Sequence, residues 1–221
     1  CRLMCFNTIS MEDVWDIPID DQFVSKPVII NNTAYLSSSR LKEEEVGQPT
    51  LYAYNISNGR EIFIREFPRD NPSQAVLINI LEEYSNISDN TSTMLLSFDK
   101  IGLSGESQKE VELIETANGS KLWKSKVQAG WGFSPEVMLI TAGNTKLLLL
   151  KLEKDIVALN NKTGAEVWHE NFSGSVLAAW NQKILKINPN EKYVALWDPL
   201  SRKEVWKTQD EREYVYGYKM G

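Results

Sequence analysis

The sequence of 221 residues predicts an all-β fold, a β-propeller built of four-stranded antiparallel blades. Two observations predict it. One strand–turn–strand motif recurs along the chain and ends each time in a large aromatic residue, at Phe63, Trp123, Trp168 and Trp206. Two further short apolar runs precede each copy, so every repeat supplies about four strands. The spacings of roughly 40 to 60 residues lie near the period of propeller blades.

The recurring motif, called here the hairpin motif, has the composition of a tight hairpin. Three copies read AYNISNGREIF at 53–63, LIETANGSKLW at 113–123 and ALNNKTGAEVW at 158–168. Gly59, Gly119 and Gly164 each stand four residues before the final aromatic. Glycine adopts the positive φ angles that tight turns need, and neighbouring Asn residues tolerate them. We therefore expect all three glycines at positive φ.

The fourth copy, ALWDPLSRKEVW at 195–206, departs from this pattern. It has no glycine in the turn and is one residue longer, so we expect Pro199 and Ser201 to form its turn. The aromatic at the end of every copy occupies the same strand position, which predicts one repeated packing site between blades. The terminal tryptophans are then expected to behave alike when replaced.

The domain organisation follows from these runs. Residues 1–12 are predicted to form an N-terminal tail, and residues 13–221 a single propeller domain. The expected blades span approximately 22–67, 74–127, 133–172 and 175–208, with a partial strand at 213–221. Trp15 closes a strand with no predicted partner before it. Four full blades with incomplete ends predict either a fragment of a larger propeller or open ends that a partner completes.

The C-terminal residues carry a pattern of their own. Tyr214, Tyr216 and Tyr218 alternate with other residues and share one face of a strand. Three aromatics on one face are costly to leave in water. We expect this tail to pair with the strand of Trp15, with a continuation of the chain or with another subunit.

Composition excludes several classes of function. The net charge is −6 and 42% of residues are hydrophobic. An acidic chain with scattered Lys and Arg argues against a nucleic-acid partner, because phosphate binding requires a basic excess. No apolar run approaches the roughly 20 residues of a membrane-spanning helix.

The hairpin motif resembles the repeat of the pyrroloquinoline-quinone-type β-propellers. The match is closest at 157–168, good at 51–63, weaker at 111–123 and partial at 193–206. The resemblance implies that the glycine makes the turn and that the aromatic locks neighbouring blades. Members of this family serve as enzymes, scaffolds and sensors, so the resemblance fixes the fold more firmly than the function.

The residues that carry chemistry are few. His169 is the single histidine, and no second His or nearby Cys supplies a transition-metal set. No nucleophile elbow, phosphate loop or dinucleotide fingerprint occurs. Quinone enzymes of the resembled family use a Ca²⁺ ion, an acidic base and often a disulfide between adjacent cysteines, whereas this chain has only Cys1 and Cys5. We predict a non-enzymatic protein without catalytic, cofactor or metal sites; a fragment of a quinone-dependent dehydrogenase is the less favoured alternative.

The first residue leads to a hypothesis about location. A chain beginning at Cys1 resembles a mature bacterial lipoprotein, in which that cysteine carries the lipid; a trimmed fragment is the alternative. Cys1 and Cys5 either form a small disulfide loop or stay free. The first functional hypothesis is an extracytoplasmic, lipid-anchored scaffold of the bacterial envelope, resembling the propeller of outer-membrane protein assembly. It would bind a partner protein, or a further subunit, through a propeller face or a strand edge.

A second hypothesis comes from asparagine. Seven Asn-x-Ser/Thr sequences occur, at Asn31, Asn55, Asn86, Asn90, Asn118, Asn161 and Asn171. Turn chemistry explains such sequences, because tight turns are rich in Asn, Ser, Thr and Gly. The alternative is glycosylation. The protein would then be a luminal or cell-surface sensor or structural ectodomain of the eukaryotic secretory pathway, similar to the luminal domains of unfolded-protein sensor kinases.

Overall fold

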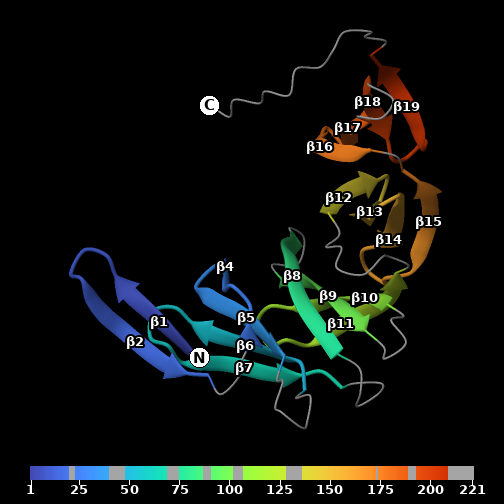
Figure 1. Cartoon of the computed structure of the whole chain (residues 1–221). Coiled ribbons are helices and arrows are strands. Elements are labelled where there is room, and N and C mark those ends of the chain that lie inside the picture. Colours follow the sequence, from blue (N-terminus) through green and yellow to red (C-terminus); the bar gives the residue numbers. More distant parts are fainter. Residues whose placement is uncertain are drawn as a thin grey trace. The chain divides into compact units, whose positions relative to one another are not determined.

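The computed structural model describes nine segments of the chain. They are residues 1–19, 23–39, 48–68, 75–86, 91–101, 107–127, 136–172, 174–188 and 193–208. The regular structure within these segments is entirely β, and most of it lies in four-stranded antiparallel sheets (Figure 1). The all-β prediction is therefore confirmed. The predicted strand at 213–221, with Tyr214, Tyr216 and Tyr218, lies outside the described residues.

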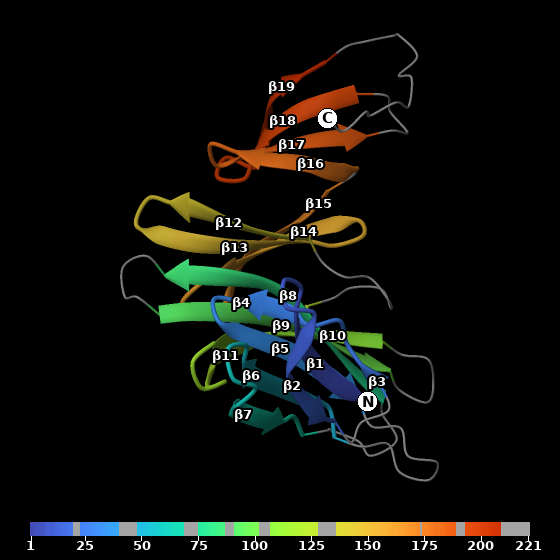
Figure 2. The same ribbon diagram turned by 90° about the vertical axis from the view of Figure 1, so that its left-hand side faces the viewer.

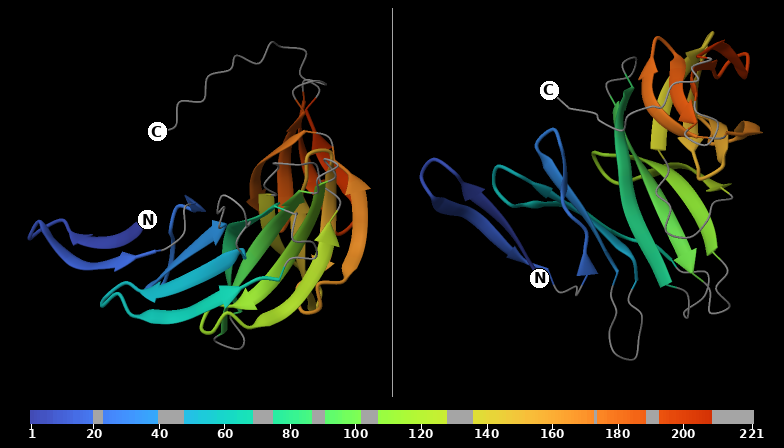
Figure 3. Two further views of the ribbon diagram at one scale, coloured as in Figure 1. Left: turned by 60° about the horizontal axis from the view of Figure 1, so that its bottom comes forward. Right: turned by 45° about the horizontal axis from the view of Figure 1, so that its top comes forward.

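The chain divides into two compact units, where the sequence predicted one domain. The first contains residues 1–135 and 162–165, and the second contains residues 136–161 and 166–221. The first unit holds a two-stranded hairpin and two larger sheets, which follow one another in chain order in Figure 3.

The N-terminal hairpin consists of β1 (Arg2–Asn7) and β2 (Glu12–Pro18), paired antiparallel. The prediction of a tail at 1–12 is wrong, and the strand of Trp15 does have a partner. Strand β1 forms because its alternating apolar side chains have a surface to cover: Leu3 packs against a cluster formed by Ile19, Leu36 and Tyr54. A free N-terminal tail would leave that cluster in water.

The first blade follows the hairpin in the same unit. Its strands are β3 (Phe23–Val24), β4 (Val28–Ile30), β5 (Thr33–Ser39), β6 (Thr50–Asn55) and β7 (Glu61–Glu66). Both β3 and β4 pair with β5, so these two short strands share the position of one blade strand. The second blade contains β8 (Ala75–Asn86), β9 (Thr91–Ile101), β10 (Ser107–Glu115) and β11 (Lys121–Val127).

The second unit holds the remaining two blades. The third blade contains β12 (Glu136–Ala142), β13 (Thr145–Lys151), β14 (Asp155–Asn160) and β15 (Glu166–Asn171). The fourth contains β16 (Ser175–Trp180), β17 (Lys183–Asn188), β18 (Tyr193–Asp198) and β19 (Lys203–Lys207). Each is a meander in which neighbours in sequence are neighbours in the sheet (Figure 2).

The apolar core lies between successive sheets inside each unit. In the first unit it joins side chains of the first blade, such as Tyr35 and Leu51, to those of the second blade, such as Met94 and Phe98. In the second unit it joins Leu149 of the third blade to Ile184 and Trp197 of the fourth. Stacked sheets bury one face of each strand on the next sheet, so every blade depends on its neighbour for stability.

Within the described residues the strand pairing reveals five copies of the hairpin motif, where the sequence showed four. In each copy the terminal aromatic pairs with a small or apolar residue, and the register shifts immediately afterwards. These pairs are Cys5–Trp15, Ala53–Phe63, Leu113–Trp123, Ala158–Trp168 and Leu196–Trp206. Four residues before each aromatic stands a residue at positive φ, namely Met11 (59°), Gly59 (68°), Gly119 (71°), Gly164 (70°) and Arg202 (57°). The positive φ predicted for the three glycines is confirmed.

Two expectations from the sequence are thereby corrected. The N-terminal hairpin is a full copy of the motif, with Met11 in place of glycine. The copy that ends at Trp206 has the same length as the others, because Leu196 and not Ala195 pairs with the aromatic. Arg202 takes the left-handed position there, while Asp198 Oδ1 accepts a hydrogen bond from the Leu200 amide at 3.0 Å.

Candidate functional site: sheet joints, an open face and a groove

The hairpin joins the first blade through Trp15. Its indole Nε1 donates a hydrogen bond to the Ile56 carbonyl at 2.6 Å. The ring lies against the turn of the first blade so closely that a Cβ on Gly59 would stand 2.8 Å from Trp15 Cγ. Glycine is thus required twice, by its positive φ and by the space that the ring occupies.

The joint between the first and second blades repeats this arrangement and adds polar contacts. A Cβ on Gly119 would stand 2.7 Å from the Phe63 ring. Arg65, two residues after the aromatic, donates to the Gly119 carbonyl at 2.6 Å and pairs with the carboxylate of Glu112. The Tyr35 hydroxyl donates to the Thr116 carbonyl at 2.8 Å. The joint therefore combines packing of an aromatic ring against a turn with an ion pair between the two sheets.

Two further aromatics complete the series. A Cβ on Gly164 would stand 2.5 Å from Trp123 Cε3, and the Ser125 hydroxyl donates to the Gly164 carbonyl. The fourth blade has no glycine in its turn, and the Trp168 ring packs edge-on against Trp197 with centroids 5.9 Å apart. At that joint Arg202, the positive-φ residue, pairs with Glu170 at 2.8 Å. The residue two positions after the aromatic contacts the next turn in three of the joints.

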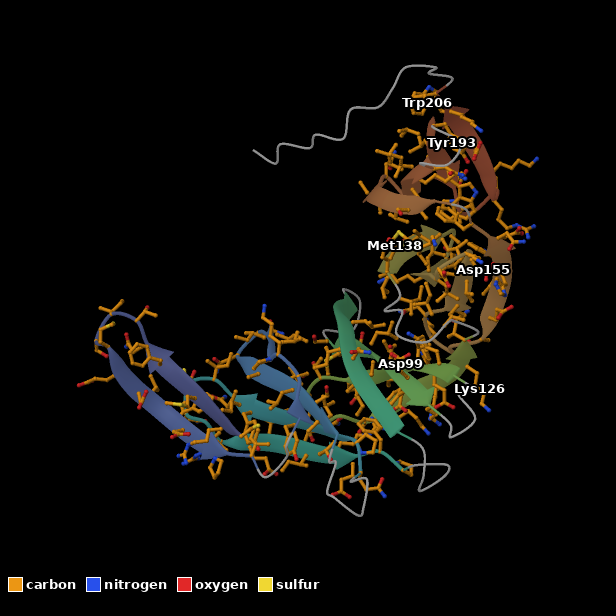
Figure 4. The ribbon with its side chains drawn as sticks, in the orientation of Figure 1. Asp99, Lys126, Met138, Asp155, Tyr193 and Trp206 are labelled. Carbon is orange, nitrogen blue, oxygen red and sulfur yellow. The ribbon has the colours of Figure 1, made fainter. Side chains whose placement is uncertain are left out.

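Trp206, the terminal aromatic of the fourth blade, differs from the others. Its side chain is 52% exposed, whereas Trp123 is 6% exposed. Figure 4 labels Trp206 on β19. The expectation of one repeated packing site is wrong for this residue, because no described sheet covers it.

The sheet face around Trp206 is apolar and partly exposed. This surface, the open face, consists of Leu185, Ile187, Val194, Leu196 and Trp206. The residues at matching positions of the third blade, Leu149, Ile156 and Ala158, are completely buried. The same face is therefore buried in the third blade and accessible in the fourth. An exposed apolar patch of this kind is typical of an interaction surface.

Buried charges occupy the second blade. The Glu110 carboxylate lies 2.8 Å from Lys100 Nζ and 2.5 Å from Lys124 Nζ. Burial raises the pKa of Glu110, but the hydrogen bonds and charges of the two lysines outweigh it, so its pKa is lowered. Lys109 pairs with Asp99 at 2.8 Å on the other side of the blade. Every one of these groups has an opposite charge within reach, which is typical of structural ion pairs.

Lys151 of the third blade is a buried cation of a different kind. Its ammonium donates to the carbonyls of Leu152 and Glu153, the second at 3.1 Å, and lies 5.5 Å from the centroid of the Phe172 ring. Burial lowers the pKa of Lys151, although the nearby carboxylates oppose this. At 3% exposure it is closed to a substrate.

A groove of about 620 Å³ separates β2 from the outer strands of the first blade. It is lined by Ile17, Pro18, Ile19, Gln48, Thr50, Tyr52, Tyr54, Gly59, Glu61, Ile64 and Glu66. The rings of Tyr52 and Tyr54 are nearly parallel, 8° apart, with centroids 6.3 Å apart. Burial, and then the charge of Glu61, raises the pKa of Tyr54, so this phenol stays neutral at physiological pH. No sequence pattern indicates this groove, because it depends on how the hairpin meets the sheet.

The other residues predicted from the sequence lie apart from these surfaces. His169 Nε2 is 3.6 Å from an Asp155 carboxylate oxygen on the neighbouring strand. Cys1 is exposed and Cys5 is half-buried, and neither thiol is part of a disulfide. Among the described residues no three His, Cys, Asp or Glu side chains gather in a metal-binding group. The described residues contain no helix that is long and apolar enough to span a membrane.

Among the described Asn-x-Ser/Thr sequences, three begin in turns, at Asn31, Asn118 and Asn161, and three begin at the last residue of a strand, at Asn55, Asn86 and Asn171. Asn55 Oδ1 accepts a hydrogen bond from the Ser57 amide at 2.9 Å, and Asn118 Oδ1 accepts one from the Ser120 amide at 2.8 Å. Both are the side-chain-to-backbone turns that Asn favours. Asn31 is a turn residue at positive φ (53°). Asn90 lies outside the described residues.

These sheets and joints define a β-propeller. Residues 107–215, just under half of the chain, match the family model described as outer membrane protein assembly factor BamB. The chain therefore carries repeats of the PQQ-type β-propeller family. A comparison with curated proteins finds no match.

Similar solved structures are distant in sequence. One is a quinohemoprotein alcohol dehydrogenase from Pseudomonas putida HK5, at 10% identity and a TM-score of 0.45, with 82% of this chain and 34% of that chain covered. Another is the WD40 domain of SCAP from fission yeast, at 12% identity and a TM-score of 0.44, with 89% and 57% covered. The chain thus spans about a third of the first and rather more than half of the second.

Proposed function

We propose that the protein is a non-enzymatic scaffold that binds a partner protein, or a further subunit, through the open face of its fourth blade. One observation carries the proposal: the open face keeps Trp206 52% exposed, while matching positions of the third blade are fully buried. Clusters of large apolar side chains around an exposed tryptophan are typical of the centres of protein interfaces.

The partner should present a sheet or an extended strand to this face. Inside each unit the equivalent faces are covered by another antiparallel sheet, and the aromatic lies over a turn of that sheet. A β-sheet of similar twist would bury all five side chains of the open face. Burial at about 25 cal/mol per Å² of apolar surface makes such a contact favourable.

The location we propose is the bacterial cell envelope. The matching family carries the name of an outer membrane assembly factor, which supports a site outside the cytoplasm. A lipid on Cys1 would anchor the protein there, and the exposure of Cys1 is compatible with it. An intact mass of the native protein tests this part: a diacylglyceryl addition supports it, and hexose-rich additions on Asn31 or Asn118 would favour the secretory-pathway alternative.

Site-specific photocrosslinking tests the binding surface. A photoreactive phenylalanine analogue at Trp206 should crosslink to a protein in cells of the source organism. The same analogue at Val167, which is 52% exposed on β15, is the matched control. Crosslinks at position 206 and not at 167 support the proposal. Equal crosslinking at both positions, or none at 206, would contradict it.

A further inference from the structure

The groove beside the hairpin is a second surface, separate from the open face. It lies wholly within the first unit, between β2 on one side and β6 and β7 on the other. Glu61, Ile64 and Glu66 of β7 form its exposed rim. Neither carboxylate of this rim forms an ion pair within the described part of the chain.

The joint between the first and second blades has an arginine side chain between its two sheets. There Arg65, two residues after the aromatic, reaches the Gly119 carbonyl and the Glu112 carboxylate. Its guanidinium also lies 4.4 Å from the centroid of the Phe67 ring. A guanidinium is therefore held between two sheets of this protein by a turn carbonyl, a carboxylate and an aromatic ring.

The hairpin joint has the same positions but lacks that cation. Two residues after Trp15 stands Ile17, which has no polar atom in its side chain. Tyr52 occupies the position that matches Glu112, because each precedes by one the residue paired with the terminal aromatic. Gly59, whose turn matches that of Gly119, also lines the groove. Three lining positions of the groove thus match Arg65, Glu112 and Gly119, the residues that form the arginine contact in the neighbouring joint.

We infer that this groove binds an extended peptide segment through an arginine side chain of that segment. The guanidinium enters between Ile17 and Tyr52, where the Gly59 turn offers a carbonyl and the tyrosine rings offer cation–π contact. Glu61 and Glu66 at the rim supply opposite charge. Ile64, which is 45% exposed, contacts an apolar residue next to the arginine.

Binding of a short basic peptide tests the inference. The probe is a fluorescein-labelled, amidated pentapeptide in which arginine alternates with valine, followed by fluorescence anisotropy on the full chain. We expect saturable binding, and binding of the glutamate–valine peptide should be absent. The double variant Glu61→Gln, Glu66→Gln should weaken binding by at least about tenfold, because both charge-assisted contacts are removed.

Two further variants separate a specific site from general attraction to an acidic protein. The control Glu12→Gln, Glu166→Gln removes two exposed carboxylates elsewhere and should change affinity less than twofold. Ile17→Arg supplies the chain's own guanidinium, as Arg65 does in the next joint, and should abolish peptide binding while the protein stays folded. Equal weakening by both double variants, unsaturable binding, or full binding by Ile17→Arg would overturn the inference.

This test is independent of the open face. Replacement of Trp206 leaves the groove untouched, because no residue of the fourth blade lines it. A failed peptide titration therefore removes the groove site alone, and a failed crosslink at position 206 removes the scaffold interface alone.

Discussion

Replacing Gly164 by alanine probes the contact on which the sheet joints depend. Its φ is +70°, and a Cβ there would stand 2.5 Å from Trp123 Cε3. A left-handed backbone costs an L-residue roughly 1–2 kcal/mol. Forcing a methyl group into a packed site costs about 1–3 kcal/mol more. The variant should lower the free energy of unfolding by about 2–5 kcal/mol.

Gly143 provides the matched control for this prediction. Its φ is +61°, yet no heavy atom lies within 4 Å of a Cβ built on it. Gly143→Ala should therefore cost only the backbone contribution of about 1–2 kcal/mol. Urea unfolding followed by tryptophan fluorescence compares the two variants. Equal losses would refute the view that the Trp123 ring presses on the turn at Gly164.

Three further predictions follow from burial and charge. Trp123→Ala should cost about 3–5 kcal/mol of unfolding free energy in thermal or urea melts, whereas Trp206→Ala should cost less than about 1 kcal/mol, because only the first leaves a cavity. The pKa of Glu110 is lowered, so its stabilising contribution is complete above the unfolded pKa of ~4.3 and is lost as pH falls through the folded pKa. Glu110→Gln should cost about 3–5 kcal/mol of unfolding free energy at pH 7 and should flatten this dependence of stability on acid pH. The lowered pKa of Lys151 means that its charge opposes folding at neutral pH and that stability rises as pH approaches the unfolded pKa near ~10.4; Lys151→Met should be neutral or stabilising in melts at pH 7 and should lack the alkaline gain. An unchanged dependence of stability on acid pH in Glu110→Gln, or strong destabilisation by Lys151→Met, would contradict these assignments.

The sequence predicted the features that local chemistry determines. Glycine four residues before an aromatic gave the turns, the positive φ angles and the meander of strands. The copy of the motif at the N-terminus was not predicted, because Met11 is not a turn-forming residue. The spacing of eight residues between Asn7 and Trp15, equal to that between Asn55 and Phe63, was the available signal.

The surfaces that we connect with function depend on tertiary placement. The exposure of Trp206 depends on whether another sheet covers the fourth blade. A repeat pattern in the sequence does not show this, because it treats every copy of the motif as equal. Similarly, the equivalence of Ile17 in the groove and Arg65 in the following joint appears only once the strand register is known.

Hydroxyl-radical footprinting of the tryptophans tests the central claim most directly. In the purified chain, oxidation measured by mass spectrometry should be fast at Trp206 and slow at Trp123, following their exposures of 52% and 6%. In intact cells the partner should cover the open face, so the rate at Trp206 should fall toward that of Trp123. A Trp206 that oxidises as fast in cells as in the purified protein would contradict the proposed interface.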